Sequence, residues 1–240
     1  MQQPMSRGRP VSDITSNKPS AARVAALVPA AGASRRMGRD KRRLPLGDGT
    51  VLEQTLARLA AGGLAPIIVV LEPSSPCSAL LAGKVEAGEV VAAENPHPER
   101  GMLSTIRCGL QRLAELAGAD DASAEREDHV SIAAVAVQPG DHPFVPPAAV
   151  KALLEAFAAE RPPLLVPRYP GSQVPGRKRG HPLLIRRDLW AEAAACDDEV
   201  GLRQLLQRRQ DDLRVLELDL AGADDDLDTP EDYARVTGAD

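Results

Sequence analysis

Short, continuous apolar runs alternate along this chain with longer segments in which apolar residues recur at helical spacing. The runs predict strands at 23–28, 67–71, 131–137 and 164–166, a weaker strand at 85–92 and an alternating one at 213–220. Helical spacing predicts helices over 50–61, 103–116, 148–159, 187–209 (with a break near Asp197 and Asp198) and within 226–236. Unbroken apolar runs are typical of strands covered on both faces, as in parallel sheets. The pattern therefore predicts an α/β fold, a single three-layer α/β/α domain with a mostly parallel, Rossmann-like sheet.

This domain is expected to span residues 22–240, because no internal repeat and no second unit interrupts the alternation. Residues 1–21 lack the apolar segment of a secretory signal and are expected to form a disordered leader. The polar segment 118–128 is expected to be a surface loop. Ligands of such folds bind at the carboxyl ends of the strands, so the loops that follow the strands are the first places to look for chemistry.

Composition excludes several classes of function. The chain has 240 residues, with 29 Lys and Arg against 34 Asp and Glu, and only 2% aromatic residues, so we expect no nucleic-acid partner. No apolar stretch approaches the roughly 20 residues that span a bilayer, so we expect no membrane partner. The cysteines at 77, 108 and 196 form no CxxC pair, which argues against a zinc ribbon and fits a reducing compartment. We therefore expect a cytoplasmic protein.

The loop after the first predicted strand, residues 29–41, combines small residues with positive charge. Ala30, Ala31 and Gly32 would let backbone N–H groups approach an anion. Six cations follow within nine residues, opposed only by Asp40: Arg35, Arg36, Arg39, Lys41, Arg42 and Arg43. The spacing fits neither GxxxxGK[ST] nor GxGxxG. A solvated basic loop would explain the charge alone, but its position after the first strand favours a polyphosphate site.

The same loop resembles the Ala-Ala-Gly-x-Ser-x-Arg-Met-Gly-x-x-Lys pattern of the MobA-like nucleotidyltransferases, and particularly of the molybdenum cofactor cytidylyltransferases. The resemblance implies a fold of the nucleotide-diphospho-sugar transferase type. It also implies that Arg36 and Lys41 are catalytic residues that bind the phosphates, and that the backbone of Ala30, Ala31 and Gly32 cradles the nucleotide. Pro29 departs from the family's usual aliphatic residue, but the N–H groups of residues 30 to 32 remain.

Two further segments resemble nucleotide and metal elements of this family. Residues 101–110, preceded by Asn95, resemble Asn…Gly-Met-x-x-Ser-Leu-x-x-Gly-Leu, which implies that Ser104 and Thr105 bind the nucleotide. A helix cap explains these hydroxyls equally well. Asp141-His142-Pro143 resembles the family's Asp-x-Pro, which implies a catalytic, Mg²⁺-binding carboxylate at Asp141.

The remaining matches lie nearer the carboxyl terminus. Residues 226–232 resemble Asp-x-Asp-Thr-Pro-Glu-Asp, which implies Asp228 as the second metal ligand, although Thr-Pro-Glu-Asp is also a good helix start. Residues 180–182, together with Asp198 and residues 201–203, resemble Gly-His-Pro and Gly-Asp-x-Gly-Ala-Arg of the acceptor half. The resemblance makes His181 an acceptor-binding residue, and the basic run 177–179 could attract an anionic acceptor or be merely solvated.

These matches imply a Mg²⁺-dependent enzyme that transfers CMP from CTP to the terminal phosphate of molybdopterin cofactor and releases pyrophosphate. A molybdoenzyme or its chaperone is then the implied protein partner. A phosphate monoester is already nucleophilic at neutral pH, which fits the lack of a convincing general base. Two alternatives stay open: a transferase that uses GTP or another NTP with a different phosphorylated or alcohol acceptor, and a nucleotide- or cofactor-binding module without turnover.

Overall fold

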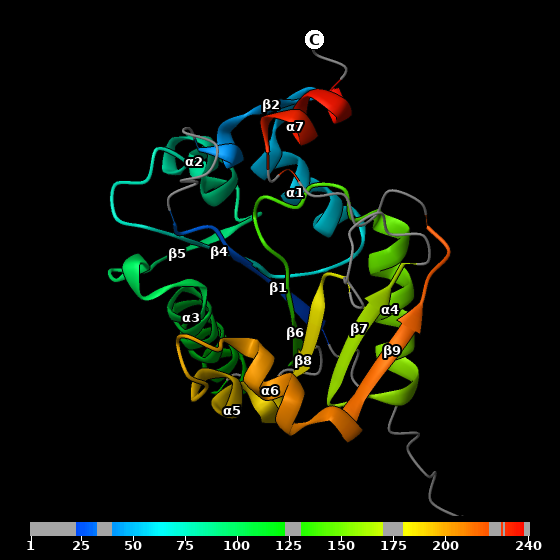
Figure 1. The fold of residues 1–240 in the computed structure, drawn as a ribbon. Coiled ribbons are helices and arrows are strands. Elements are labelled where there is room, and N and C mark those ends of the chain that lie inside the picture. The colour runs from blue at the N-terminus through cyan, green and yellow to red at the C-terminus, as the bar shows by residue number, and fades with distance from the viewer. Residues whose placement is uncertain are drawn as a thin grey trace, which may run out of the picture.

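A seven-stranded sheet forms the centre of the molecule (Figure 1). The computed structural model describes residues 23–32, 40–122, 131–169, 180–220, 227 and 229–237; the predicted leader lies outside them. In spatial order the strands are β5 (Val91–Glu94), β4 (Ile67–Leu71), β1 (Arg23–Pro29), β6 (Ile132–Val137), β8 (Leu183–Arg186), β7 (Leu164–Arg168) and β9 (Leu213–Glu217). Only β8 in this sheet runs antiparallel to its neighbours, so the predicted, mostly parallel sheet is confirmed.

Helices cover both faces of this sheet. Their bounds are α1 (Val51–Ala61), α2 (Ser78–Glu86), α3 (Met102–Ala122), α4 (Pro147–Glu160), α5 (Trp190–Ala194), α6 (Leu202–Arg208) and α7 (Pro230–Thr237). Because successive strand residues point to opposite faces, Ala26 of β1 packs in the core with α1, α2 and α4, whereas Leu27 packs in the core with α3, α5 and α6. The three-layer arrangement predicted from the apolar runs is therefore confirmed.

Several boundaries differ from the prediction. The strand expected at 85–92 is β5, which begins only at Val91, and Val85 instead lies exposed near the end of α2. That helix was not predicted, because among its residues only Leu81 is buried and its apolar pattern is weak. Helix α3 continues through Ala122 into the expected loop 118–128. The break expected near Asp197 and Asp198 in the helical segment 187–209 is confirmed, since short helices there are separated by a loop at 195–201.

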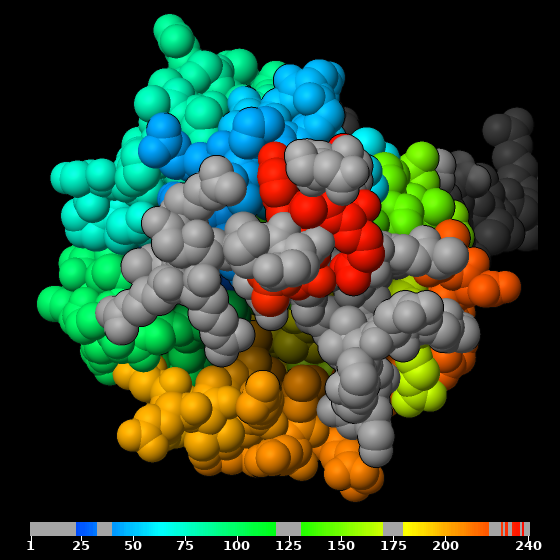
Figure 2. Space-filling view, turned by 45° about the horizontal axis from the view of Figure 1, so that its top comes forward, coloured from blue at the N-terminus to red at the C-terminus, as the bar shows by residue number. Residues whose placement is uncertain are grey.

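The loops that contain many of the predicted site residues lie along one edge of the sheet. Strands β1, β4, β5 and β6 run parallel and end there. The antiparallel β8 begins at the same edge, since its Leu183 pairs with Val137 at the end of β6. Figure 2 looks obliquely onto this edge and shows a recess between α3 (green) and α6 (orange). In the described part of the chain, no helix combines the length and apolar character needed to cross a membrane.

Candidate active site

The ends of β1 and β6 approach each other closely. The Gly140 N–H donates to the Pro29 carbonyl at 3.2 Å, and a Cβ added at Gly140 would come within 3.2 Å of the Ala30 Cβ. Packing therefore favours the small residues present at 30 and 140. The next residue, Asp141, keeps 35% of its side chain exposed at this edge. The buried Gln138 holds the turn around it by donating from Nε2 to the His142 carbonyl at 3.1 Å.

The backbone groups predicted to cradle a nucleotide are partly engaged. Ala30 N–H donates to the Val70 carbonyl at 2.9 Å, which continues the β1–β4 ladder. Gly32 N–H donates to a carboxylate oxygen of Glu72 at 3.0 Å. The expectation that all the N–H groups of residues 30 to 32 remain available is therefore corrected, because those of Ala30 and Gly32 already have partners.

The basic residues that follow Gly32 differ in their surroundings. Arg35, Arg36 and Arg39 lie outside the described residues. Arg42 is buried and forms ion pairs with Asp40 at 2.7 Å and Glu72 at 3.1 Å, so its charge is already engaged by these two carboxylates. Lys41, in the single 3₁₀ turn Lys41–Arg43, is only 5% exposed.

The two hydroxyls predicted near the nucleotide, Ser104 and Thr105, are buried against Asn95. The Asn95 Nδ2 donates to Ser104 Oγ and Thr105 Oγ1, each at 2.9 Å, and its Oδ1 accepts from the His97 N–H at 2.9 Å. This network fixes the turn that leads from β5 into α3. The predicted contact of Ser104 and Thr105 with the nucleotide stays a prediction.

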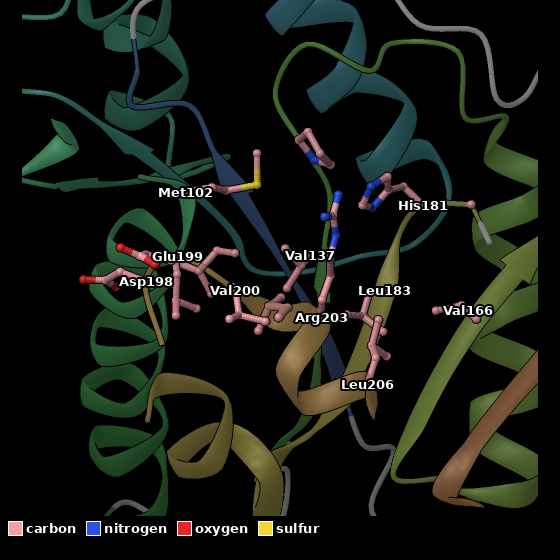
Figure 3. Close-up of a pocket in the computed structure, with 16 residues that line it drawn as sticks. Met102, Val137, Val166, His181, Leu183, Asp198, Glu199, Val200, Arg203 and Leu206 are labelled. Atoms are coloured by element: carbon pink, nitrogen blue, oxygen red, sulfur yellow. The ribbon is translucent and has the colours of Figure 1, made fainter. Parts of the chain in front are cut away.

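A cavity of about 610 Å³ opens between α3, the end of β6, the start of β8 and α6 (Figure 3). It brings together the segments predicted for the acceptor half, since His181, Asp198 and Arg203 all line it. The remaining lining residues are Met102, Leu103, Ile106, Val137, Pro139, Val166, Gly180, Leu183, Glu199, Val200, Gly201, Leu202 and Leu206. The part of the lining that the structure describes is thus largely apolar, and the predicted run 177–179 lies outside the described residues.

Two arginines hold the wall of this cavity that contains Asp198. Arg107 of α3 ion-pairs with the Asp198 carboxylate and donates to the carbonyls of Ala194 at 2.6 Å and Cys196 at 2.5 Å. Arg100 donates to the other Asp198 oxygen at 2.8 Å. Asp198 therefore acts here as an anchor to α3. Sequence patterns did not indicate this, because the partners lie far apart in the chain.

The C-terminal helix α7 lies near the segment that follows the β1 loop and the start of α1 (Figure 1). Asp228, the predicted second metal ligand, lies outside the described residues. Its neighbour Leu227 is buried in a small core with Leu44 and Val51, against which Phe144 and Tyr233 pack. The Tyr233 hydroxyl donates to the Pro45 carbonyl at 2.5 Å, and Figure 2 shows α7 (red) beside this blue segment.

The predicted start of this last helix is confirmed. Thr229 Oγ1 accepts from the Asp232 N–H at 3.1 Å, and the Asp232 carboxylate accepts from the Thr229 N–H at 3.0 Å. Within the described residues, no group of three His, Cys, Asp or Glu is arranged to hold a metal ion. The predicted pair of metal ligands, Asp141 and Asp228, stays a prediction, because Asp228 lies outside the described residues.

This fold is an open α/β sheet, a class of protein whose ligands bind at the carboxyl ends of the strands. A family model, the MobA-like NTP transferase domain, matches residues 26–213, so the chain belongs to this family of nucleotidyltransferases. No curated protein matches the chain in sequence.

Solved structures share the fold. Rv0371c from Mycobacterium tuberculosis H37Rv is 24% identical, with 91% of this chain and 100% of that one covered and a TM-score of 0.66; a complex of Rv0371c with manganese is also similar, at a TM-score of 0.59. The nucleotidyl transferase Mth528 from Methanothermobacter is 21% identical, with 90% and 96% covered and a TM-score of 0.65. A CMP:2-keto-3-deoxy-manno-octonic acid synthetase complexed with CTP is 15% identical, with 90% and 98% covered and a TM-score of 0.60.

Proposed function

We propose that this chain is a cytoplasmic, Mg²⁺-dependent cytidylyltransferase. It transfers CMP from CTP to the terminal phosphate of a molybdopterin-type cofactor and releases pyrophosphate, and the product passes to a molybdoenzyme or its chaperone. The observation that carries the acceptor class is the largely apolar cavity that His181, Asp198 and Arg203 share beside the end of β6. The family match and the resemblance of the β1 loop support the chemistry.

The chemistry of the cavity favours one kind of acceptor. A small sugar acid or polyol would need many hydrogen-bonding partners, and each hydroxyl left unpaired against an apolar wall costs about 1–3 kcal/mol. Among the described residues that line it, four can carry charge: His181, Asp198, Glu199 and Arg203. Figure 3 shows Arg203 extending into the cavity, where its guanidinium can meet an anion. A large ring body with one phosphate fits this lining better.

The reaction requires few groups from the protein. An oxygen of the acceptor phosphate forms a bond to the α-phosphorus, and the bond from that phosphorus to the bridging oxygen breaks as pyrophosphate leaves. Lys41, with Arg36, would neutralise the departing phosphates, while Arg203 and His181 orient the acceptor. Because the acceptor phosphate is already ionised at neutral pH, no side chain has to remove a proton.

The residues at the end of β6 fit a magnesium ion. Asp141 offers a partly exposed carboxylate at the carboxyl edge of the sheet, and Mg²⁺ prefers such oxygen ligands alongside substrate phosphates. Asp141 and Asp228 would hold the ion. When bound, it would supply positive charge to the oxygens of the α-phosphate.

The experiment is pyrophosphate release by the full chain with Mg²⁺ and molybdenum cofactor, comparing CTP, GTP, ATP and UTP at equal concentration. We expect release with CTP, and its loss in Asp141→Ala. The control is Asp188→Ala, whose carboxylate pairs with Arg186 on β8 at 2.7 Å and lies outside the proposed site. Release with GTP alone would overturn the choice of donor. Tight CTP binding without turnover, unaffected by Asp141→Ala, would favour the non-catalytic alternative.

A further inference from the structure

A buried cluster of charges lies beside the β1 loop, and the proposed reaction does not use it directly. Its centre is the Arg42 guanidinium, whose side chain is only 7% exposed. Arg42 Nε donates to Asp40 Oδ1 at 2.7 Å and Arg42 Nη2 donates to Asp40 Oδ2 at 2.8 Å, a bidentate pair. The other edge of the guanidinium faces Glu72, with donor distances of 3.1 and 3.3 Å.

Glu72 connects this cluster to Gly32, at the start of the loop that follows β1. It follows β4 directly and accepts the N–H of Gly32, a residue whose φ of 143° is one that side-chain-bearing residues rarely adopt. Ser75 donates its hydroxyl to the same carboxylate at 3.0 Å. One carboxylate therefore binds both Gly32, just beyond β1, and Arg42, in the 3₁₀ turn Lys41–Arg43.

Lys41 is placed by the same contacts. It lies between Asp40 and Arg42 in one 3₁₀ turn, and the Asp40 carboxylate caps that turn by accepting the Arg42 N–H at 3.1 Å. Both neighbours of Lys41 are thus held by the cluster. Loss of Glu72 would release the Gly32 N–H and one edge of the guanidinium together.

We propose that Glu72 and Arg42 are positioning residues for the triphosphate: they hold Gly32 and Lys41 in place at the ends of β1 and β4. This inference rests on the proposed function, in which Lys41 neutralises the departing phosphates. A cation that is already ordered before binding loses less entropy when the anion arrives, so disorder introduced at Lys41 weakens the binding of the outer phosphates. It does not weaken contacts to the base, the ribose and the α-phosphate.

The test compares nucleotides that differ only in these phosphates. Dissociation constants for CTP and CMP, with GTP and GMP as a second pair, are measured with Mg²⁺ by calorimetry on the full chain. The variants are Glu72→Ala, Glu72→Gln, which keeps the size and one oxygen, and Arg42→Lys. The control is Glu160→Gln, whose ion pair with Arg214 at 3.0 Å lies at the opposite end of the sheet.

We expect Glu72→Ala to weaken triphosphate binding by about tenfold or more while monophosphate binding changes by less than about twofold. Glu72→Gln should be intermediate, because its remaining oxygen can still accept the Gly32 N–H, and Glu160→Gln should match the wild type. If Glu72→Ala does not fold, Glu72→Gln and Arg42→Lys provide the same comparison.

The two proposals fail in different ways. A wild-type chain that binds none of the triphosphates overturns the proposed function and this inference with it. A wild-type chain that binds them, with variants that keep its ratio of triphosphate to monophosphate affinity, overturns this inference alone. Equal weakening of both nucleotides also overturns it, because it indicates a general structural role.

Discussion

The centroids of the His142 and His181 imidazole rings lie 5.3 Å apart, and the rings meet edge to face. His142 follows the predicted metal ligand Asp141, and its Nε2 lies 3.9 Å from an Asp141 carboxylate oxygen. His181 lines the cavity, and its backbone carbonyl accepts the Tyr169 hydroxyl at 3.0 Å. The ring contact therefore connects the end of β6, where nucleotidyl transfer is proposed, to the proposed acceptor cavity.

Replacing His181 with alanine should affect the acceptor more than the nucleotide. The variant loses a side chain of the cavity and a ring contact worth about 0.5–1.5 kcal/mol. We expect the KM for the acceptor to rise about tenfold and the KM for CTP to stay within about twofold, as measured by pyrophosphate release. His97→Ala is the control, because the His97 side chain is exposed and its ion-pair partner is the equally exposed Glu99, outside the cavity. Equal rises in both KM values would contradict the assignment of His181 to the acceptor.

Arg107 should matter more for stability than Arg100, although both contact Asp198. Arg107→Met removes two donors to backbone carbonyls as well as the ion pair, so we expect a loss of about 1–3 kcal/mol in the free energy of unfolding. Arg100→Met breaks only a pair whose arginine is 56% exposed, worth less than about 1 kcal/mol. Urea unfolding of both variants measures the difference. Similar losses would show that the backbone contacts of Arg107 do not hold this wall.

The Arg42 cluster predicts a specific dependence of stability on pH. Burial alone would raise the pKa values of Asp40 and Glu72. At Asp40 the hydrogen bonds and charge of Arg42 outweigh burial, and at Glu72 the charge of Arg42 does so together with hydrogen bonds from backbone N–H groups and Ser75, so both pKa values are lowered. Unfolded Asp and Glu have pKa values of about 3.9 and 4.3. As the pH falls below about 5, the unfolded chain therefore takes up protons before the folded chain does, and this contribution to stability is lost.

Arg42→Met should remove that contribution. We expect it to lower the free energy of unfolding by about 3 kcal/mol at pH 7, and this difference from the wild type should shrink steadily between pH 5 and pH 3. Urea unfolding across this range measures it. A difference that stays constant with pH would mean that the two carboxylates do not depend on Arg42.

The fold was predictable because its central strands are covered on both faces and so read as unbroken apolar runs. Strand β8 was not predicted, and nothing in Leu183–Arg186 marks it as antiparallel. The meeting of His181, Asp198 and Arg203 at one cavity agrees with their grouping by family resemblance. The resemblance did not indicate that Asp198 forms ion pairs with Arg100 and Arg107.

Arg42 shows the limit of reading charge from sequence. In the chain it is one of six neighbouring cations, and nothing local distinguishes it from a phosphate-binding residue. Its partner Glu72 lies 30 residues away and reaches it only because β4 pairs with β1. Polar contacts of this kind depend on strand order, which hydrophobic periodicity does not encode.

The docking of α7 gives a test of the proposed metal site. Leu227 is 1% exposed, so Leu227→Ala should cost about 2–5 kcal/mol in the free energy of unfolding. Because Leu227 precedes Asp228, we also expect the Mg²⁺ concentration at half-maximal turnover to rise at least about threefold. Leu153→Ala in α4 is the matched control, since Leu153 is fully buried but belongs to the main core and not to the small core that holds Leu227. It should lose similar stability, as measured by urea unfolding, without a change in Mg²⁺ dependence. If both variants shift the Mg²⁺ dependence equally, general loosening of the fold is the cause and Asp228 loses its support as a ligand.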